Sequence, residues 1–209
     1  MAGFALLGAM FVAGAAAVYF ALSRSSARLK RENYVRHFVF PAPVLRSLLK
    51  TYPHLEDKDF FLVARALRQY FLVHLRSGRR SVGMPSKVVD ALWHEFILDT
   101  KTYHRFCGHA FGAYFHHVPP GHAPSAGAER EALRRTWRLA CLEENIDPRN
   151  ATRLPLLFAI DSKLKIPDGH DYDLEVIKKT PQSDSSGCGG IGCGGDGCSG
   201  GCGGGCGGD

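Results

Sequence analysis

The middle of the chain combines aspartate, histidine and cysteine at spacings that could place these side chains together. Asp90 and His94 are four residues apart, so on a helix both side chains leave the same face, about 6 Å from one another. Cys107, His116 and His117 follow where a second helix and a loop could return to that face. Carboxylate, imidazole and thiolate together form a ligand set for zinc or another soft transition metal. These five residues are the candidate metal site.

The spacing of these residues matches no established zinc motif. Leu98 stands where the helical metalloprotease motif needs its second histidine, and Cys107 lacks a second cysteine at finger spacing. A carboxylate that orients an imidazole also satisfies a buried histidine without a metal, and Cys107 could be a small core residue. The sequence therefore leaves a metal or catalytic role and a packing role open. It contains no Ser/His/Asp grouping, phosphate-binding glycine loop or dinucleotide fingerprint, so no common enzyme class is indicated.

Apolar side chains recur every three or four residues around this site, which predicts helices. Ser86 is a good N-cap for a helix bearing Asp90 and His94, and a second helix is expected from about Thr100 to Gly112. The two would form a central helical hairpin. Further helices are expected over residues 44–52, 56–78, 128–145 and 156–165. No segment alternates with the two-residue period of a strand, so the predicted fold class is all-α, with a compact helical domain at residues 35–179.

An uncharged apolar segment precedes this domain. Residues 3–22 number 20, and at about 1.5 Å of helical rise each they would cover the ~30 Å hydrocarbon layer of a membrane. The basic residues that follow are Arg24, Arg28, Lys30 and Arg31. We interpret residues 1–23 as a single transmembrane helix and 24–34 as a basic juxtamembrane segment, which by the positive-inside rule keeps the rest of the chain cytoplasmic. A cleaved signal peptide is the alternative, but its positively charged start is missing.

The net charge of +6 is unevenly distributed. Residues 24–80 hold 13 Lys/Arg against 4 Asp/Glu, whereas residues 81–186 hold 13 against 14. Because the basic residues lie beside the predicted anchor, they argue against a general nucleic-acid binder. The partners expected are therefore a membrane and an unidentified protein, with no specific nucleic acid. A four-residue spacing of small residues in the anchor also suggests a weak homodimer, through Ala5, Ala13, Ala17 and Ala21.

The chain ends in a segment dominated by glycine and cysteine. Residues 187–209 contain 14 of the 24 glycines and five of the seven cysteines, and they offer almost no apolar surface to bury, which predicts disorder over residues 180–209. The thiols are Cys188, Cys193, Cys198, Cys202 and Cys206. They could bind a soft metal ion in the reducing cytoplasm, or they could be low-complexity sequence without a defined ligand.

A group of motifs in the middle of the chain resembles a known family. The pattern Asp90-x-x-Trp93-His94, followed by Thr100, Tyr103, Phe106-Cys107, Phe111-Gly112 and His116-His117-x-Pro119, is similar to bacterial proteins related to the glycine-rich domain-containing protein family. The segment LPLLFAID at residues 154–161 and the style of the tail resemble the same group. The resemblance covers roughly residues 35–170 and implies no particular reaction, cofactor or substrate. In plant relatives a second histidine often follows two residues after the first, where this chain has Phe96.

The sequence favours a non-enzymatic, single-pass protein of the bacterial inner (plasma) membrane, with its N-terminus outside and its helical domain and tail in the cytoplasm. The helical domain would serve as an interaction or scaffold module, and the thiol-rich tail could bind soft metals. The alternative is a metal-dependent enzyme or a metal-handling protein that uses Asp90, His94, Cys107 and His117, with a metal that the tail thiols could supply. These two hypotheses differ in whether the domain carries a metal of its own.

Overall fold

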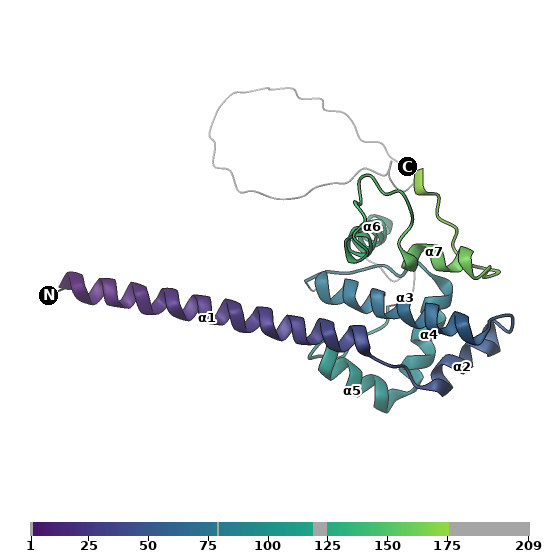
Figure 1. The fold of residues 1–209 in the computed structure, drawn as a ribbon, viewed down its shortest axis with the longest axis horizontal. Helices are drawn as coiled ribbons and strands as arrows, with labels where there is room; N and C mark the ends of the chain where they lie inside the picture. The colour runs from purple at the N-terminus through teal and green to yellow at the C-terminus, as the bar shows by residue number, and fades with distance from the viewer. Residues whose placement is uncertain (1, 79, 119–124, 176–209) are drawn as a thin grey trace, which may run out of the picture.

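The computed structural model describes residues 2–78, 80–118 and 125–175, with the backbone alone described at residues 2–13 and 17. This part of the chain forms seven helices and no strand, so the all-α prediction is confirmed (Figure 1). The helices are α1 (Ala2–His37), α2 (Ala42–Thr51), α3 (Asp57–Arg76), α4 (Lys87–Leu98), α5 (Thr100–Ala110), α6 (Ala126–Glu143) and α7 (Leu156–Lys163).

Helix α3 is the centre of the fold, because it packs against α1, α2, α4, α6 and α7. Its start is a reciprocal capping box, in which the Glu56 side chain accepts from the Asp59 backbone and Asp59 accepts from the Glu56 N–H at 2.9 Å. The helix ends at Arg76, and Gly78 then adopts a φ of +64°, which glycine tolerates without strain. The acidic start and the glycine stop expected from the sequence are both present.

Helices α4 and α5 pack against one another and are separated by Asp99 alone. Asp99 ends α4 and caps α5, since its carboxylate accepts from the Thr102 N–H at 3.3 Å. Helix α5 ends before Gly112, whose φ of +75° lets its N–H reach back to the Cys107 carbonyl at 3.1 Å. The short connection at Asp99 and the turn at Gly112 together determine where the chain continues after α5.

An aromatic cluster fills the space between the end of α1, α3, α4, α5 and the segment after α5. Phe71 of α3 lies within 6.3 Å, between ring centroids, of Trp93 on α4, Phe106 on α5 and Phe115 beyond it. Tilted and edge-on ring pairs of this kind add to the free energy gained by burying the rings. The cluster makes the position of residues 111–117 depend on α3 and α4.

Helix α1 extends away from the helical body, and only its C-terminal part packs on it (Figure 1). Glu32, which is 9% exposed, pairs with Arg76 of α3 at 2.6 Å, and Arg36 pairs with Glu143 of α6. Arg31 donates to the carbonyl of Phe111 at 3.1 Å. Part of the basic run expected to lie beside a membrane therefore holds α1 against the domain.

In the part of the chain whose side chains are described, no helix carries an apolar stretch long enough to cross a membrane. The predicted transmembrane helix is thus not supported by these residues, and most of residues 3–22 lie where the backbone alone is described. The tail cysteines at Cys188, Cys193, Cys198, Cys202 and Cys206 lie outside the described residues, as does the predicted disorder of residues 180–209.

Candidate metal centre

A buried carboxylate anchors the start of α4, the helix that carries two of the candidate ligands. Asp161 of α7 is 2% exposed and accepts four hydrogen bonds. Its Oδ1 accepts from the Ser86 hydroxyl at 2.6 Å and the Val88 N–H at 3.3 Å, and its Oδ2 accepts from the Lys87 N–H at 2.8 Å and the His170 N–H at 3.0 Å. The negative charge also suits the positive end of the helix dipole. This clamp joins α4 to α7.

Asp90, His94 and His117 come together one helical turn beyond this clamp. His117 Nε2 donates to Asp90 Oδ1 at 2.8 Å, and His94 Nδ1 lies 3.6 Å from Asp90 Oδ2. The two imidazole rings have centroids 4.2 Å apart. One ligand atom from each residue lies within 4.8 Å of the other two.

A chain of hydrogen bonds positions the segment that carries His117. The indole N–H of Trp93 donates to the Tyr103 hydroxyl at 3.1 Å, and that hydroxyl donates to the Phe115 carbonyl. Phe115 also stacks on Trp93, with ring centroids 4.9 Å apart, and the His117 ring packs on Trp93 at 4.6 Å. Because Trp93 and Tyr103 are 2% and 0% exposed, these bonds are shielded from water. The aromatic cluster thus sets the position of His117 relative to α4.

A further imidazole lies behind this segment but takes no part in the cluster of ligands. His74 of α3 stacks on Phe115 with ring centroids 3.7 Å apart. Burial lowers the pKa of His74 to about 4, because the charged form would lose its hydration. His74 is therefore neutral near pH 7 and acts as part of the packing around Phe115.

Two of the five candidate ligands lie elsewhere. Cys107 is 1% exposed and faces Tyr103 and the Phe115 backbone. Burial raises the pKa of the Cys107 thiol, and its hydrogen bonds offset only part of that, so the thiol keeps its proton. His116 is exposed and contacts the ring of Tyr114. The expected convergence of five residues is thus corrected to three, because the helix and the extended segment turn Cys107 inward and His116 outward.

The three remaining residues fit a divalent transition metal by donor type and position. Ligand atoms around tetrahedral zinc, at bond lengths of about 2.0–2.2 Å, are about 3.4 Å apart. The ligand atoms lie within 4.8 Å of one another, near that value, and the His94 side chain, which is 52% exposed, has room to rotate. The site has a buried side and an open side, since the His117 side chain is 11% exposed and that of Asp90 21%. Three ligands leave a fourth position for water or another molecule on the open side.

Comparison with known proteins places the chain in a family. Residues 30–196 match the family model described as UCP032817-like, which is more than half of the chain. The chain belongs to the UCP032817-like family. No curated protein and no solved structure matches it. The resemblance to the glycine-rich domain-containing protein family stays a prediction beside this result.

The UCP032817-like match begins within the packed part of α1 and includes all three clustered residues together with the clamp of Ser86 and Asp161. Sequence reasoning identified Ser86 as an N-cap but missed its partner, which lies 75 residues further along the chain. The segment LPLLFAID, which ends in Asp161, was the available signal. Its likeness to other proteins does not by itself predict a contact with α4.

Proposed function

We propose that this protein binds one divalent transition metal ion, zinc in the first instance, through Asp90, His94 and His117. The observation that carries the proposal is the convergence of a carboxylate and two imidazoles from α4 and the segment after α5, with ligand atoms within 4.8 Å of one another. Nitrogen and oxygen donors of this kind suit zinc and its neighbours in the first transition series.

The surroundings of the three residues support an open, reactive site over a closed structural one. Structural zinc sites are closed by four protein ligands, whereas catalytic sites have three and keep a position for water. The described residues supply three ligands here, and His94 at the rim is half exposed. A zinc ion held in this way would lower the pKa of a bound water toward neutrality and supply a hydroxide nucleophile. The proposed function is therefore metal binding with the capacity for metal-assisted hydrolysis.

The residues that hold the proposed ligands in position also support a metal site. Ligating imidazoles in proteins are oriented by groups beyond the metal, and loss of those groups typically weakens binding 10- to 100-fold. Trp93 packs against the His117 ring, and the bond from Tyr103 to the Phe115 carbonyl fixes the backbone two residues earlier. Asp161 fixes the first turn of α4, one turn before Asp90. Each ligand except the exposed His94 thus has a rigid support.

Titration with Co²⁺ tests the proposal, because cobalt in a low-symmetry nitrogen and oxygen site gives visible d–d absorption. We expect these bands to grow to one equivalent per full-length chain and to be lost in Asp90→Asn and His94→Ala. Cys107→Ala should keep both the bands and the stoichiometry, since the thiol is turned into the core. Bands that persist in Asp90→Asn while disappearing in Cys107→Ala would contradict the proposed ligands.

A second candidate function is membrane attachment through α1. The observation that favours it is a group of large apolar side chains that are exposed on the part of α1 beyond the helical body: Val18, Tyr19, Phe20, Leu22 and Leu29. Arg24 and Arg28 lie among them and suit the anionic headgroup region. The helical domain would then present its metal site beside a membrane surface.

Cell fractionation tests this second function. The full chain should sediment with membranes and stay there in high salt, because apolar burial is insensitive to ionic screening. A version that begins at Ser23 should move to the supernatant. Equal distribution of the two versions in the supernatant would contradict attachment through this segment.

A further inference from the structure

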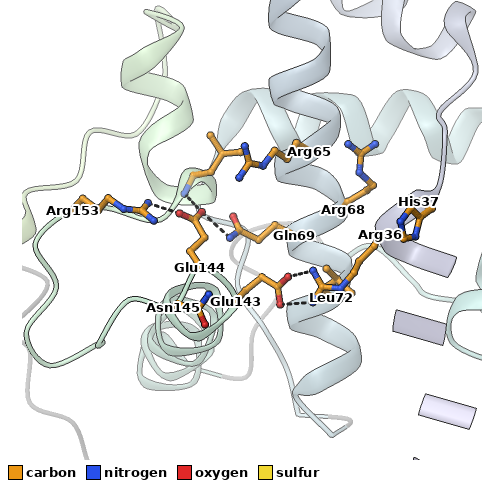
Figure 2. Close-up of a pocket in the computed structure, with 11 residues that line it drawn as sticks. Arg36, His37, Arg65, Arg68, Gln69, Leu72, Glu143, Glu144, Asn145 and Arg153 are labelled. Atoms are coloured by element: carbon orange, nitrogen blue, oxygen red, sulfur yellow. Dashed lines mark hydrogen bonds and ion pairs between the residues drawn. The ribbon is translucent and has the colours of Figure 1, made fainter. Parts of the chain in front are cut away.

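A hollow lies away from the three clustered residues, between the end of α1, the middle of α3, the end of α6 and the start of α7. Its volume is about 530 Å³, within the range of small-molecule sites. Figure 2 shows four arginine side chains around it, Arg36, Arg65, Arg68 and Arg153, with Glu143 and Glu144 between them. The hollow is therefore strongly charged and carries more positive than negative groups.

The two carboxylates that line the hollow already accept hydrogen bonds from residues other than Arg65 and Arg68. Both oxygens of Glu143 pair with Arg36 (Figure 2), and Arg76 of α3 shares one of them. Glu144 accepts from the Gln69 amide at 2.9 Å, from the Leu156 N–H at 2.6 Å and from Arg153.

The surroundings of Glu144 keep its carboxylate ionised. Burial alone would raise the pKa of Glu144, but the hydrogen bonds from Leu156, Arg153 and Gln69 outweigh it and lower the pKa. The Glu143 side chain is only 8% exposed and is held by two guanidinium groups. Every oxygen of the two carboxylates thus already has at least one partner, and none of these partners is Arg65 or Arg68.

Arg65 and Arg68 are the surplus charges of the hollow. They are one turn apart on α3, and neither forms an ion pair with a carboxylate among the described residues. Arg68 donates one bond, to the Phe38 carbonyl at 3.1 Å, and no hydrogen bond joins the Arg65 guanidinium to a described residue. Burial, and then the like charge of Arg65, lower the pKa of Arg68. An anion placed between the two guanidinium groups would relieve that repulsion.

We propose that Arg65 and Arg68 bind the phosphate group of a small phosphorylated molecule, with the rest of the hollow taking its organic part. Two unpaired guanidinium groups match the two negative charges of a phosphate monoester, and their N–H groups suit its oxygens. A ligand with a single carboxylate would leave the positive charge of one of the two guanidinium groups uncompensated.

The phosphate could belong to a soluble metabolite or to a lipid headgroup. The hollow lies at the C-terminal end of α1, which at 1.5 Å per residue is about 10 Å of helix from Leu29 and about 20 Å from Leu22. This separation from the exposed apolar part of α1 favours a soluble molecule.

Calorimetry on the full chain tests the proposal with glycerol 3-phosphate, with glycerol as the phosphate-free control. We expect glycerol 3-phosphate to bind and glycerol to give no heat. Each of Arg65→Gln and Arg68→Gln should weaken binding about tenfold or more, because each removes a charge-assisted contact. Arg46→Gln is the matched control, since Arg46 is exposed on α2, lies outside the hollow and changes the net charge equally.

Arg65 is exposed and makes no hydrogen bond to a described residue, so Arg65→Gln should fold normally. This variant keeps the test valid even if Arg68→Gln fails to fold. Sedimentation with vesicles that contain phosphatidic acid, whose headgroup is a phosphate monoester, compared with phosphatidylcholine vesicles, forms the second arm. Binding to these vesicles that is lost in Arg65→Gln, without binding of glycerol 3-phosphate, would assign the phosphate to a lipid. The proposal is overturned if no probe binds, or if Arg65→Gln binds every probe as well as Arg46→Gln does.

Discussion

Replacing His117 by alanine is expected to lower the affinity of the chain for Zn²⁺ about 100-fold or more. His117 is the ligand with the best-defined position, since its side chain is 11% exposed, it donates to Asp90 at 2.8 Å, and Trp93 packs on its ring. Losing one of three ligands exceeds the 10- to 100-fold cost that is typical when an outer supporting group is lost. Competition against a fluorescent zinc chelator would measure the change.

The neighbouring His116 provides a matched control for this experiment. It has the same chemistry and an adjacent position, but it is exposed and contacts Tyr114. His116→Ala should bind zinc within a few-fold of the unmodified chain. If the two variants lose the same affinity for Zn²⁺, then His117 has no specific role as a ligand and the proposed site is wrong.

Asp161→Asn is expected to lower the free energy of unfolding by about 3–5 kcal/mol, the largest stability effect that we anticipate for a change of this size. The substitution keeps the volume but turns one acceptor oxygen into an amide donor that faces backbone N–H groups and the Ser86 hydroxyl. At least one N–H at the start of α4 or at His170 would then be buried without a partner. Urea unfolding followed by circular dichroism would measure the loss.

Asp171→Asn is the control for Asp161→Asn. Asp171 is exposed and accepts one bond, from the Ser162 hydroxyl at 2.7 Å, so its loss should cost about 1 kcal/mol or less. If the two variants unfold at the same urea concentration, then the clamp between α7 and α4 contributes little and the support of the metal site must come from the aromatic cluster.

The helices could be predicted from local signals, because each signal acts within a few residues. The acidic start at Glu56, the cap at Ser86 and the glycines at 78 and 112 have the predicted roles. The ends of α2, α6 and α7 differ from expectation by at most two residues, and after α6 and α7 the positive-φ residues Asn145 and Lys165 stand in place of a glycine stop.

The metal site could be predicted only in part. Helical spacing places Asp90 and His94 on one face, and the structure agrees, with 3.6 Å between them. The direction of Cys107 depends on the aromatic rings that surround α5, and the choice between His116 and His117 depends on the twist of an extended segment. Neither is encoded in spacing, since both follow from contacts between residues that are distant in the chain.

Long-range pairing also determines the features that sequence reasoning missed. Arg31 belongs to the predicted juxtamembrane segment, yet it contacts Phe111, and Arg36, which follows that segment, contacts Glu143. The contact between Arg36 and Glu143 spans 107 residues. Charge counts reveal an excess of arginine, but they do not reveal which of the charges find a partner when the helices pack.

Metal analysis of the purified chain tests the central claim most directly. The full chain and a version truncated after Ser186, both purified under reducing conditions and dialysed against excess Zn²⁺ and then buffer, should each retain one metal ion per chain. Asp90→Asn combined with His94→Ala should retain none in the truncated version while keeping its helical content. Metal retained by the full chain and absent from the truncated version would place binding in the tail and contradict a centre at Asp90, His94 and His117.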